Sequence, residues 1–121
     1  MSTSFIRLTA QGDPESGMQP SDLTPATAFT SADKTELNHT FFAGADDNPL
    51  VGVWECAPCR EVFEAYPVHE FIQLLSGSLT LTHADGRTDT FTAGDTFFIP
   101  KGTPLTWEIT ETVRKYYMIA N

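Results

Sequence analysis

Regularly spaced glycine and proline residues in the second half of the chain constrain its fold most strongly. Glu70 is followed after six residues by Gly77, and Gly94 is followed after five residues by Pro100 and, one residue later, by Gly102. Glycine and proline are the residues that most often mark turns, and the segments between them are short and rich in Phe, Thr, Leu and Ile. The spacing therefore predicts short strands joined by tight turns.

From residue 40 onward, strand-like runs alternate with turn signals, and we find no convincing helical period. The first two runs, 40–43 and 50–56, flank a polar turn and predict a β-hairpin. Further strands are predicted over 61–66, 71–75, 79–82, 88–92, 96–99, 105–109 and 113–119. About eight or nine strands at this spacing predict an all-β fold, an antiparallel sandwich or barrel.

The N-terminal third has a different composition. It is polar, contains Pro14, Pro20 and Pro25, and carries only scattered apolar residues. We expect residues 1–39 to form an extended arm and residues 40–121 to form one barrel domain. Two alternatives remain open for the arm: partial disorder, or an edge strand lying across the barrel or across a partner subunit.

Length and charge limit the classes of function. A chain of 121 residues with 40% hydrophobic residues suits one packed domain. No apolar run approaches the ~20 residues that span a bilayer, and the first nine residues lack an apolar signal core, so we expect a cytoplasmic protein without a membrane partner. The net charge of -9 makes nucleic acid an improbable partner, because such a charge repels phosphate backbones.

Four segments together resemble a known family. They are Gly52–Cys56, His69–Phe71 with Gly77, Gly94–Gly102, and Trp107 with residues 113–117. This combination resembles the small single-domain cupins, and is similar to the cupin domains of ureidoglycine aminohydrolase and to the ethanolamine-utilisation cupins. The resemblance implies an RmlC-like jelly-roll barrel (a double-stranded β-helix) with a ligand site inside. It also implies a homodimer in which strands or arms cross between subunits.

The resemblance fails at the usual metal ligands. Metal-binding cupins place two histidines before the motif glutamate and a third after the second motif, and the matching positions here hold Glu64, Tyr66 and Leu105 around the retained Glu70. Neither these positions nor the pair shifted by one residue holds histidine. We therefore expect no cofactor. If an ion binds, Glu64, Tyr66 and Glu70 would hold it, and a hard ion such as manganese or magnesium would suit them.

Strand alternation groups the candidate site residues. If no bulge intervenes, Glu64, Tyr66 and Glu70 project into the barrel, and Leu105 and Trp107 line the same cavity from a neighbouring strand. Glu70 and Tyr66 are the candidates for acid-base catalysis. The candidate ligand-binding residues are Trp54, Glu64, Leu105, Trp107 and Tyr117. Plain core packing is the alternative interpretation for Trp107 and Tyr66.

The surroundings of Glu70 allow two interpretations. If Glu64 and Glu70 share a cavity, repulsion and desolvation would raise the pKa of at least one of them and suit acid-base chemistry. Alternatively, Glu64 faces solvent at a strand end, and Lys101, Arg114 or Lys115 neutralises Glu70. His69 has the opposite parity to Glu70 and is expected on the outer or dimer face.

The two cysteines, Cys56 and Cys59, form a CxxC pattern that follows a strand instead of opening a helix. We interpret them as two reduced thiols near a strand end, with a disulfide or an adventitious metal as the alternative.

The sequence is compatible with three functions. The first is an enzyme that acts on a small nitrogenous or hydroxylated metabolite by acid-base chemistry. The second is a non-catalytic module that binds or senses such a ligand, and the third is a filled barrel that acts through its dimer surface. We favour a small-molecule site, because barrel mouths commonly hold pockets with a few polar groups.

Overall fold

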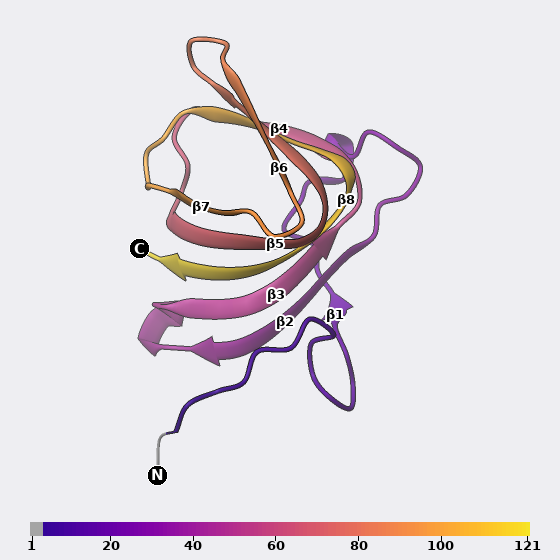
Figure 1. The fold of residues 1–121 in the computed structure, drawn as a ribbon, viewed down its shortest axis with the longest axis vertical. Coiled ribbons are helices and arrows are strands. Elements are labelled where there is room, and N and C mark those ends of the chain that lie inside the picture. Colours follow the sequence, from indigo (N-terminus) through magenta and orange to yellow (C-terminus); the bar gives the residue numbers. More distant parts are fainter. Residues whose placement is uncertain (1–3) are drawn as a thin grey trace.

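The computed structural model describes residues 4–121, and strands dominate them (Figure 1). The first three residues of the predicted arm lie outside the described range. The strands are β1 (Gln19–Pro20), β2 (Glu36–Ala43), β3 (Leu50–Cys56), β4 (Cys59–Phe63), β5 (His69–His83), β6 (Thr88–Thr92), β7 (Thr96–Ile99) and β8 (Leu105–Ala120); two single 3₁₀ turns are η1 (Ala26–Ala28) and η2 (Ala45–Asp47). The predicted all-β fold is confirmed.

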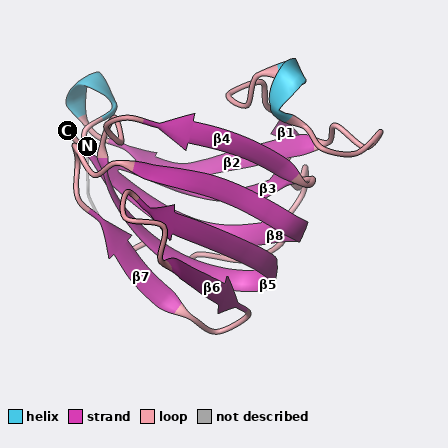
Figure 2. Ribbon diagram, turned by 90° about the horizontal axis from the view of Figure 1, so that it is seen from above, coloured by secondary structure: helices cyan, strands magenta, loops and turns pink. Residues whose placement is uncertain are grey.

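Two long strands, β5 and β8, pair with each other and organise the whole barrel. The first half of β5 pairs with the second half of β8, and this pair is flanked by β7 on one side and by β3, β2 and β1 on the other. The other halves pair in the same way and are flanked by β6 and β4. All these pairings are antiparallel, and Figures 1 and 2 show β5 and β8 curving from one group of strands into the other. The arrangement is a jelly-roll barrel.

The middle of β5 bends where the sequence predicted a turn. Strands 71–75 and 79–82 are one continuous strand, and its register with β8 shifts around Gly77. Gly77 has a φ of 89°, and a Cβ atom there would lie 2.1 Å from the carbonyl oxygen of Thr112. Only glycine allows this close approach. The predicted break between strands 105–109 and 113–119 is also wrong, because β8 bends past the same point without interruption.

Burial alternates along both long strands, which defines the inside of the barrel. In β5 the buried residues Glu70, Ile72 and Leu74 alternate with exposed neighbours, and in β8 Lys115 and Tyr117 are buried. Their shared face points into the barrel. The apolar core contains Ile72, Leu74, Leu79, Ile109 and Val113, together with the two cysteines.

The polar N-terminal segment packs against the barrel of its own chain. Strand β1 pairs with the start of β2, and Phe29 forms a bridge with Cys59. Strand β2 begins at Glu36, four residues before the predicted strand. It pairs antiparallel with β3, which confirms the predicted hairpin. In the described part of the chain no helix has the length and hydrophobicity that crossing a membrane requires.

Candidate functional site

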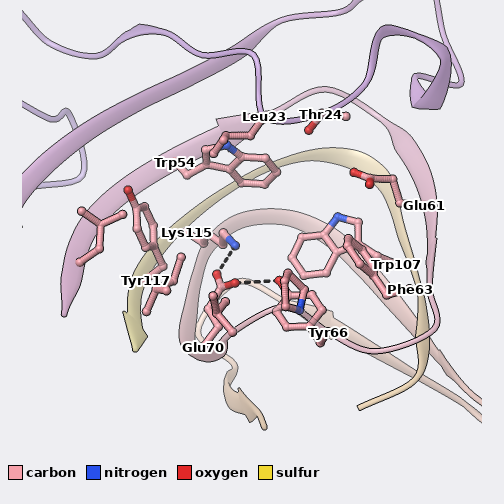
Figure 3. A pocket seen from close by; sticks show the side chains of 14 residues that line it. Leu23, Thr24, Trp54, Glu61, Phe63, Tyr66, Glu70, Trp107, Lys115 and Tyr117 are labelled. Carbon is pink, nitrogen blue, oxygen red and sulfur yellow. Dashed lines mark hydrogen bonds and ion pairs between the residues drawn. The ribbon is translucent and has the colours of Figure 1, made fainter. Parts of the chain in front are cut away.

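One end of the barrel contains a pocket of about 340 Å³, shown in Figure 3. Its walls are mainly aromatic and aliphatic, with a few polar groups. The lining residues are Leu23, Thr24, Leu50, Trp54, Glu61, Phe63, Tyr66, Pro67, Val68, Glu70, Trp107, Lys115, Tyr117 and Ile119. They come from the arm, β3, β4, β5 and β8 and from the loop after β4, so distant parts of the sequence build one site.

A buried ion pair lies at the bottom of this pocket. The Nζ atom of Lys115 donates to Glu70 over 2.5 Å, and the Tyr66 hydroxyl donates to the other carboxylate oxygen over 2.7 Å. The Lys115 and Glu70 side chains are 7% and 4% exposed. Removing both charges from water is costly, and this cost is offset only because each group has a close partner. The interpretation in which Lys115 neutralises Glu70 is therefore confirmed.

Aromatic rings surround the ammonium group of Lys115. Its Nζ lies 4.7 Å from the ring centroid of Trp54, 4.8 Å from that of Trp107 and 5.7 Å from that of Tyr117. These distances suit cation–π attraction, which is strongest for tryptophan. The cage forms because Lys115 is the direct strand partner of Trp54, while Gly52 leaves room for the ring of Tyr117 over β3. Thus the aromatic side chains hold a lysine of the same chain.

The second motif positions Tyr66. The Tyr66 N–H donates to Thr103, and the N–H of Gly102 donates to the Tyr66 carbonyl. Gly102 has a φ of 92°, which favours glycine. These two backbone bonds fix a residue that lies in a loop. Burial, followed by the nearby charge of Glu70, raises the pKa of the Tyr66 phenol, so it remains a proton donor at neutral pH.

The arm closes one side of the pocket through a second buried carboxylate, Glu36. Its oxygens accept hydrogen bonds from the Ser21 hydroxyl, the Leu23 and Thr24 N–H groups and the Trp54 indole. Burial alone would raise the pKa of Glu36, but these hydrogen bonds outweigh it and hold the pKa below its usual value. Sequence reasoning missed Glu36, which lay in the predicted arm.

Glu61 also lines the pocket and was not predicted. It projects inward from β4 directly opposite Trp107 on β8. Desolvation and the charge of Glu36 raise the pKa of Glu61. Strand parity could have found it: Cys59, Glu61 and Phe63 share the less exposed face of β4.

The structure brings together five of the predicted site residues. Glu70, Tyr66, Trp54, Trp107 and Tyr117 all line the pocket, whereas their catalytic or binding roles stay predictions.

Two predicted positions need correction. Glu64 is exposed, because Cys59, Glu61 and Phe63 form the less exposed face of β4 and the position after Phe63 has the opposite parity. Leu105 is buried but lines a separate hollow of about 230 Å³, formed by the end of β5, by β6 and β7 and by the turn after β7. Glu64 and Glu70 therefore share no cavity.

The residues of the barrel do not fit the metal site of other cupins. Both carboxylate oxygens of Glu70 are engaged by Lys115 and Tyr66, and Glu64 lies on the surface. Over residues 4–121 no cluster of three or more His, Cys, Asp or Glu side chains has a metal-binding arrangement. A metal ion at Glu70 would have to displace the ammonium of Lys115.

The cysteines are free, buried thiols at the end of β3 and the start of β4, as predicted. A hydrogen bond with Cys59 and burial raise the pKa of the Cys56 thiol, which also contacts the Thr24 hydroxyl at 3.7 Å. His69 lies on the outer side of β5, where its Nδ1 accepts from the Lys101 N–H and its ring stacks on Phe98.

Comparison with known families agrees with this fold. The family pattern of the EutQ-like cupin domain matches residues 43–117, which is more than half of the chain. The chain belongs to this family. No curated protein matches the sequence of this cupin.

Solved structures support the same fold. A Pseudomonas syringae protein of unknown function from the DUF861 family aligns with a TM-score of 0.77 and 26% identity over 90% of this cupin, which spans 46% of that protein's length. The putative ethanolamine utilization protein Q of Salmonella typhimurium aligns with a TM-score of 0.61 and 22% identity, covering 86% of this cupin and 97% of that chain. EutQ of Clostridium difficile aligns with a TM-score of 0.59 and 19% identity, covering 73% of this cupin and 69% of that chain. At this identity the last two show the fold alone.

Proposed function

We propose that this cupin binds a small organic molecule in its barrel pocket. One observation carries the proposal. A single pocket of about 340 Å³ combines apolar aromatic walls with the hydrogen-bonded cluster of Lys115, Glu70 and Tyr66. Pockets of this size with a few convergent polar groups are the usual form of small-molecule sites. A barrel serving only as a scaffold would gain more stability from an apolar core than from a buried ion pair.

Binding without turnover is the form that the geometry favours. Glu70 already accepts from two donors, and Tyr66 holds its proton firmly, so neither group is free to act as a base. These side chains instead make a fixed polar floor for a ligand. We propose that the pocket works in this way without a resident metal.

An enzymatic role is the second candidate. Tyr66, Glu70 and Lys115 form a continuous path of hydrogen bonds along which a proton could move once a substrate displaces one partner. Such a step would suit a nitrogenous or hydroxylated substrate. The resemblance to ureidoglycine aminohydrolase makes ureides the first compounds to test, although the histidine positions of metal-binding cupins hold other residues here.

Intrinsic fluorescence offers a direct test of binding. The chain has two tryptophans, Trp54 and Trp107, and both line the pocket. We expect a saturable change in tryptophan emission with at least one member of a panel of ureides, amino alcohols and small sugars. Saturation that survives a Trp107→Phe substitution but disappears in Trp107→Arg would place the ligand in the pocket. A panel that leaves emission and melting temperature unchanged would contradict the proposal.

Turnover is measured on the same panel. Product formation that is lost in Glu70→Gln and kept in the exposed control Glu64→Gln would establish the enzyme. Binding without product, in both the parent protein and Glu64→Gln, would establish the binding module.

We also propose a homodimer, with a second copy covering the outer face of the long sheet. A row of neighbouring residues crosses five strands there: Phe98, Phe71, Met118, Val51 and Phe42 are successive cross-strand partners. Four of them, Phe98, Phe71, Met118 and Phe42, are 55%, 42%, 46% and 45% exposed. The row contains no charge, so a second copy can meet it symmetrically. Light scattering should give twice the chain mass, and Phe71→Asp should give the monomer; a monomeric parent protein would contradict the proposal.

A further inference from the structure

Two sets of polar groups in the pocket differ in their hydrogen bonding. The set at the bottom, Lys115, Glu70 and Tyr66, is mutually hydrogen bonded and balanced in charge. The second set is Glu61 with the indole N–H of Trp107, which lie on adjacent strands as direct partners. Within residues 4–121 neither the Glu61 carboxylate nor the Trp107 N–H has a hydrogen-bond partner.

The second set is open to the pocket. Trp107 as a residue is only 5% exposed, but within residues 4–121 no fully buried side-chain nitrogen or oxygen lacks a hydrogen-bond partner, so the unpaired N–H and the Glu61 carboxylate are still reached from the pocket. Figure 3 shows the Glu61 carboxylate and the indole nitrogen on the same side of the pocket, beneath Leu23 and Thr24 of the arm. The other indole of the pocket is paired, because the Trp54 N–H donates to Glu36 over 3.0 Å. The free Glu61 carboxylate thus marks a place where a donor group of a ligand completes the hydrogen bonding.

The charge of the surroundings selects the sign of that ligand. Glu36, Glu61 and Glu70 place three carboxylates at or just behind the pocket wall, against the single ammonium of Lys115. Lys115 is already engaged by Glu70 and by the three rings of its cage. An anionic group would therefore meet repulsion, and the described lining residues offer it no cation besides Lys115. A cationic group would pair with Glu61 and reduce the excess of negative charge.

We propose that the ligand is a small organic cation, a protonated amine, whose ammonium group pairs with Glu61 while its apolar body lies against the pocket-lining rings of Phe63 and Trp107. This inference rests on the proposed function, because it names the chemical class that the same pocket binds. Phe63 stands two residues from Glu61 on the inner face of β4, so it supplies apolar surface beside the carboxylate. The raised pKa of Glu61 agrees with a carboxylate that lacks a partner until the cation arrives.

Three probes of the same shape and different charge test the proposal. They are benzylamine, benzyl alcohol and benzoate, titrated by tryptophan emission and by calorimetry against the parent protein. We expect benzylamine to bind about tenfold or more tighter than benzyl alcohol, which corresponds to one charge-assisted hydrogen bond, and benzoate to bind weakest. In Glu61→Gln the preference for the amine should disappear while the affinity for benzyl alcohol stays within about threefold.

The exposed Glu64, one residue beyond the end of β4, provides a matched control, and Glu64→Gln should keep the full preference. Binding of all three probes with equal affinity, or a preference that survives Glu61→Gln, would overturn the inference and leave the proposed function in place. Saturable binding of none of the probes, up to their solubility limits, would also overturn the inference, whereas the proposed function is overturned only when the panel of ureides, amino alcohols and small sugars fails as well.

Discussion

The protein contains two buried carboxylates, Glu36 and Glu70, whose residues are 5% and 3% exposed, and it stabilises them by different means. Glu70 is held inside the barrel by one cation and one phenol, which come from β8 and from the loop after β4. Within the described part of the chain, Glu36 pairs with no cation. Four neutral donors hold it, and three of them belong to the arm: the Ser21 hydroxyl and the N–H groups of Leu23 and Thr24.

The difference shows which parts of the site stand alone. The Glu70 ion pair depends on a single residue, Lys115, and on strands that the fold requires anyway. The Glu36 network depends on the arm, and it fixes both the arm and the indole of Trp54 at the pocket wall. Removing Lys115 should therefore abolish the Glu70 ion pair, whereas removing one donor should weaken the Glu36 network only in part.

The largest effect is expected for Lys115→Met. This change leaves Glu70 buried without a cation, which should lower the free energy of unfolding by roughly 3–5 kcal/mol at neutral pH. The measurement is urea denaturation followed by circular dichroism. The double variant Lys115→Met with Glu70→Gln should recover a large part of the loss, because no uncompensated charge remains. Equal instability of the single and double variants would show that cage packing, and not charge, dominates.

Glu36→Ala should have a smaller effect on stability and a larger one on the arm. It leaves the Trp54 indole and two arm N–H groups without their acceptor, at a cost of roughly 2–3 kcal/mol. Hydrogen exchange at Leu23 and Thr24 should rise well before the barrel unfolds, because the arm loses its anchor while β3, β5 and β8 keep theirs. The isosteric Glu36→Gln retains acceptor capacity and should lose less. Unchanged exchange in the arm would contradict the assigned role of Glu36.

The fold was largely predictable because its signals are local. Turn residues such as Gly94 and Gly102 and the alternation along 69–75 specify short antiparallel strands, and the cupin resemblance then orders them. The continuity of β5 through Gly77 was not predictable in the same way. A glycine with positive φ marks a turn and a bend equally well, and only the close approach of Thr112 distinguishes them.

The site was predictable only in part, because it depends on pairing between distant segments. Alternation placed Glu70 inward and grouped it with Trp107. It failed for Glu64, because the parity of Tyr66 and Glu70 does not carry back through the loop to β4, where Cys59, Glu61 and Phe63 form the less exposed face. Lys115 was one of three candidate cations for Glu70, and only the register of β5 with β8, in which Leu74 faces Lys115, selects it. The contact between Glu36 and the arm has no sequence signal, since it joins side chain and backbone across an irregular segment.

Acid titration should separate the arm from the barrel. The pKa of Glu36 is lower in the folded protein than its usual value of 4.5. Its contribution to stability is therefore fully present above pH 4.5 and is lost as the pH falls through the lower folded pKa. Thermal melts below pH 4.5 should show a steeper loss of stability in the parent protein than in Glu36→Gln. If the melting temperatures of the two proteins fall in parallel below pH 4.5, other carboxylates control stability in this pH range.

The smallest effect is expected at the half-buried pair of Glu55 and Arg114, which repeats the chemistry of Glu70 and Lys115 nearer the surface. The Arg114 guanidinium donates to Glu55 through two nitrogens over 3.0 and 2.8 Å and also to the Ala10 carbonyl. The two side chains are 21% and 28% exposed, so water solvates them in part. Glu55→Gln should cost about 1 kcal/mol or less in urea denaturation. The difference should shrink further in ~1 M salt, where screening acts over about 3 Å. A loss as large as that of Lys115→Met would show that the ion pairs of this barrel are governed by geometry and not by burial.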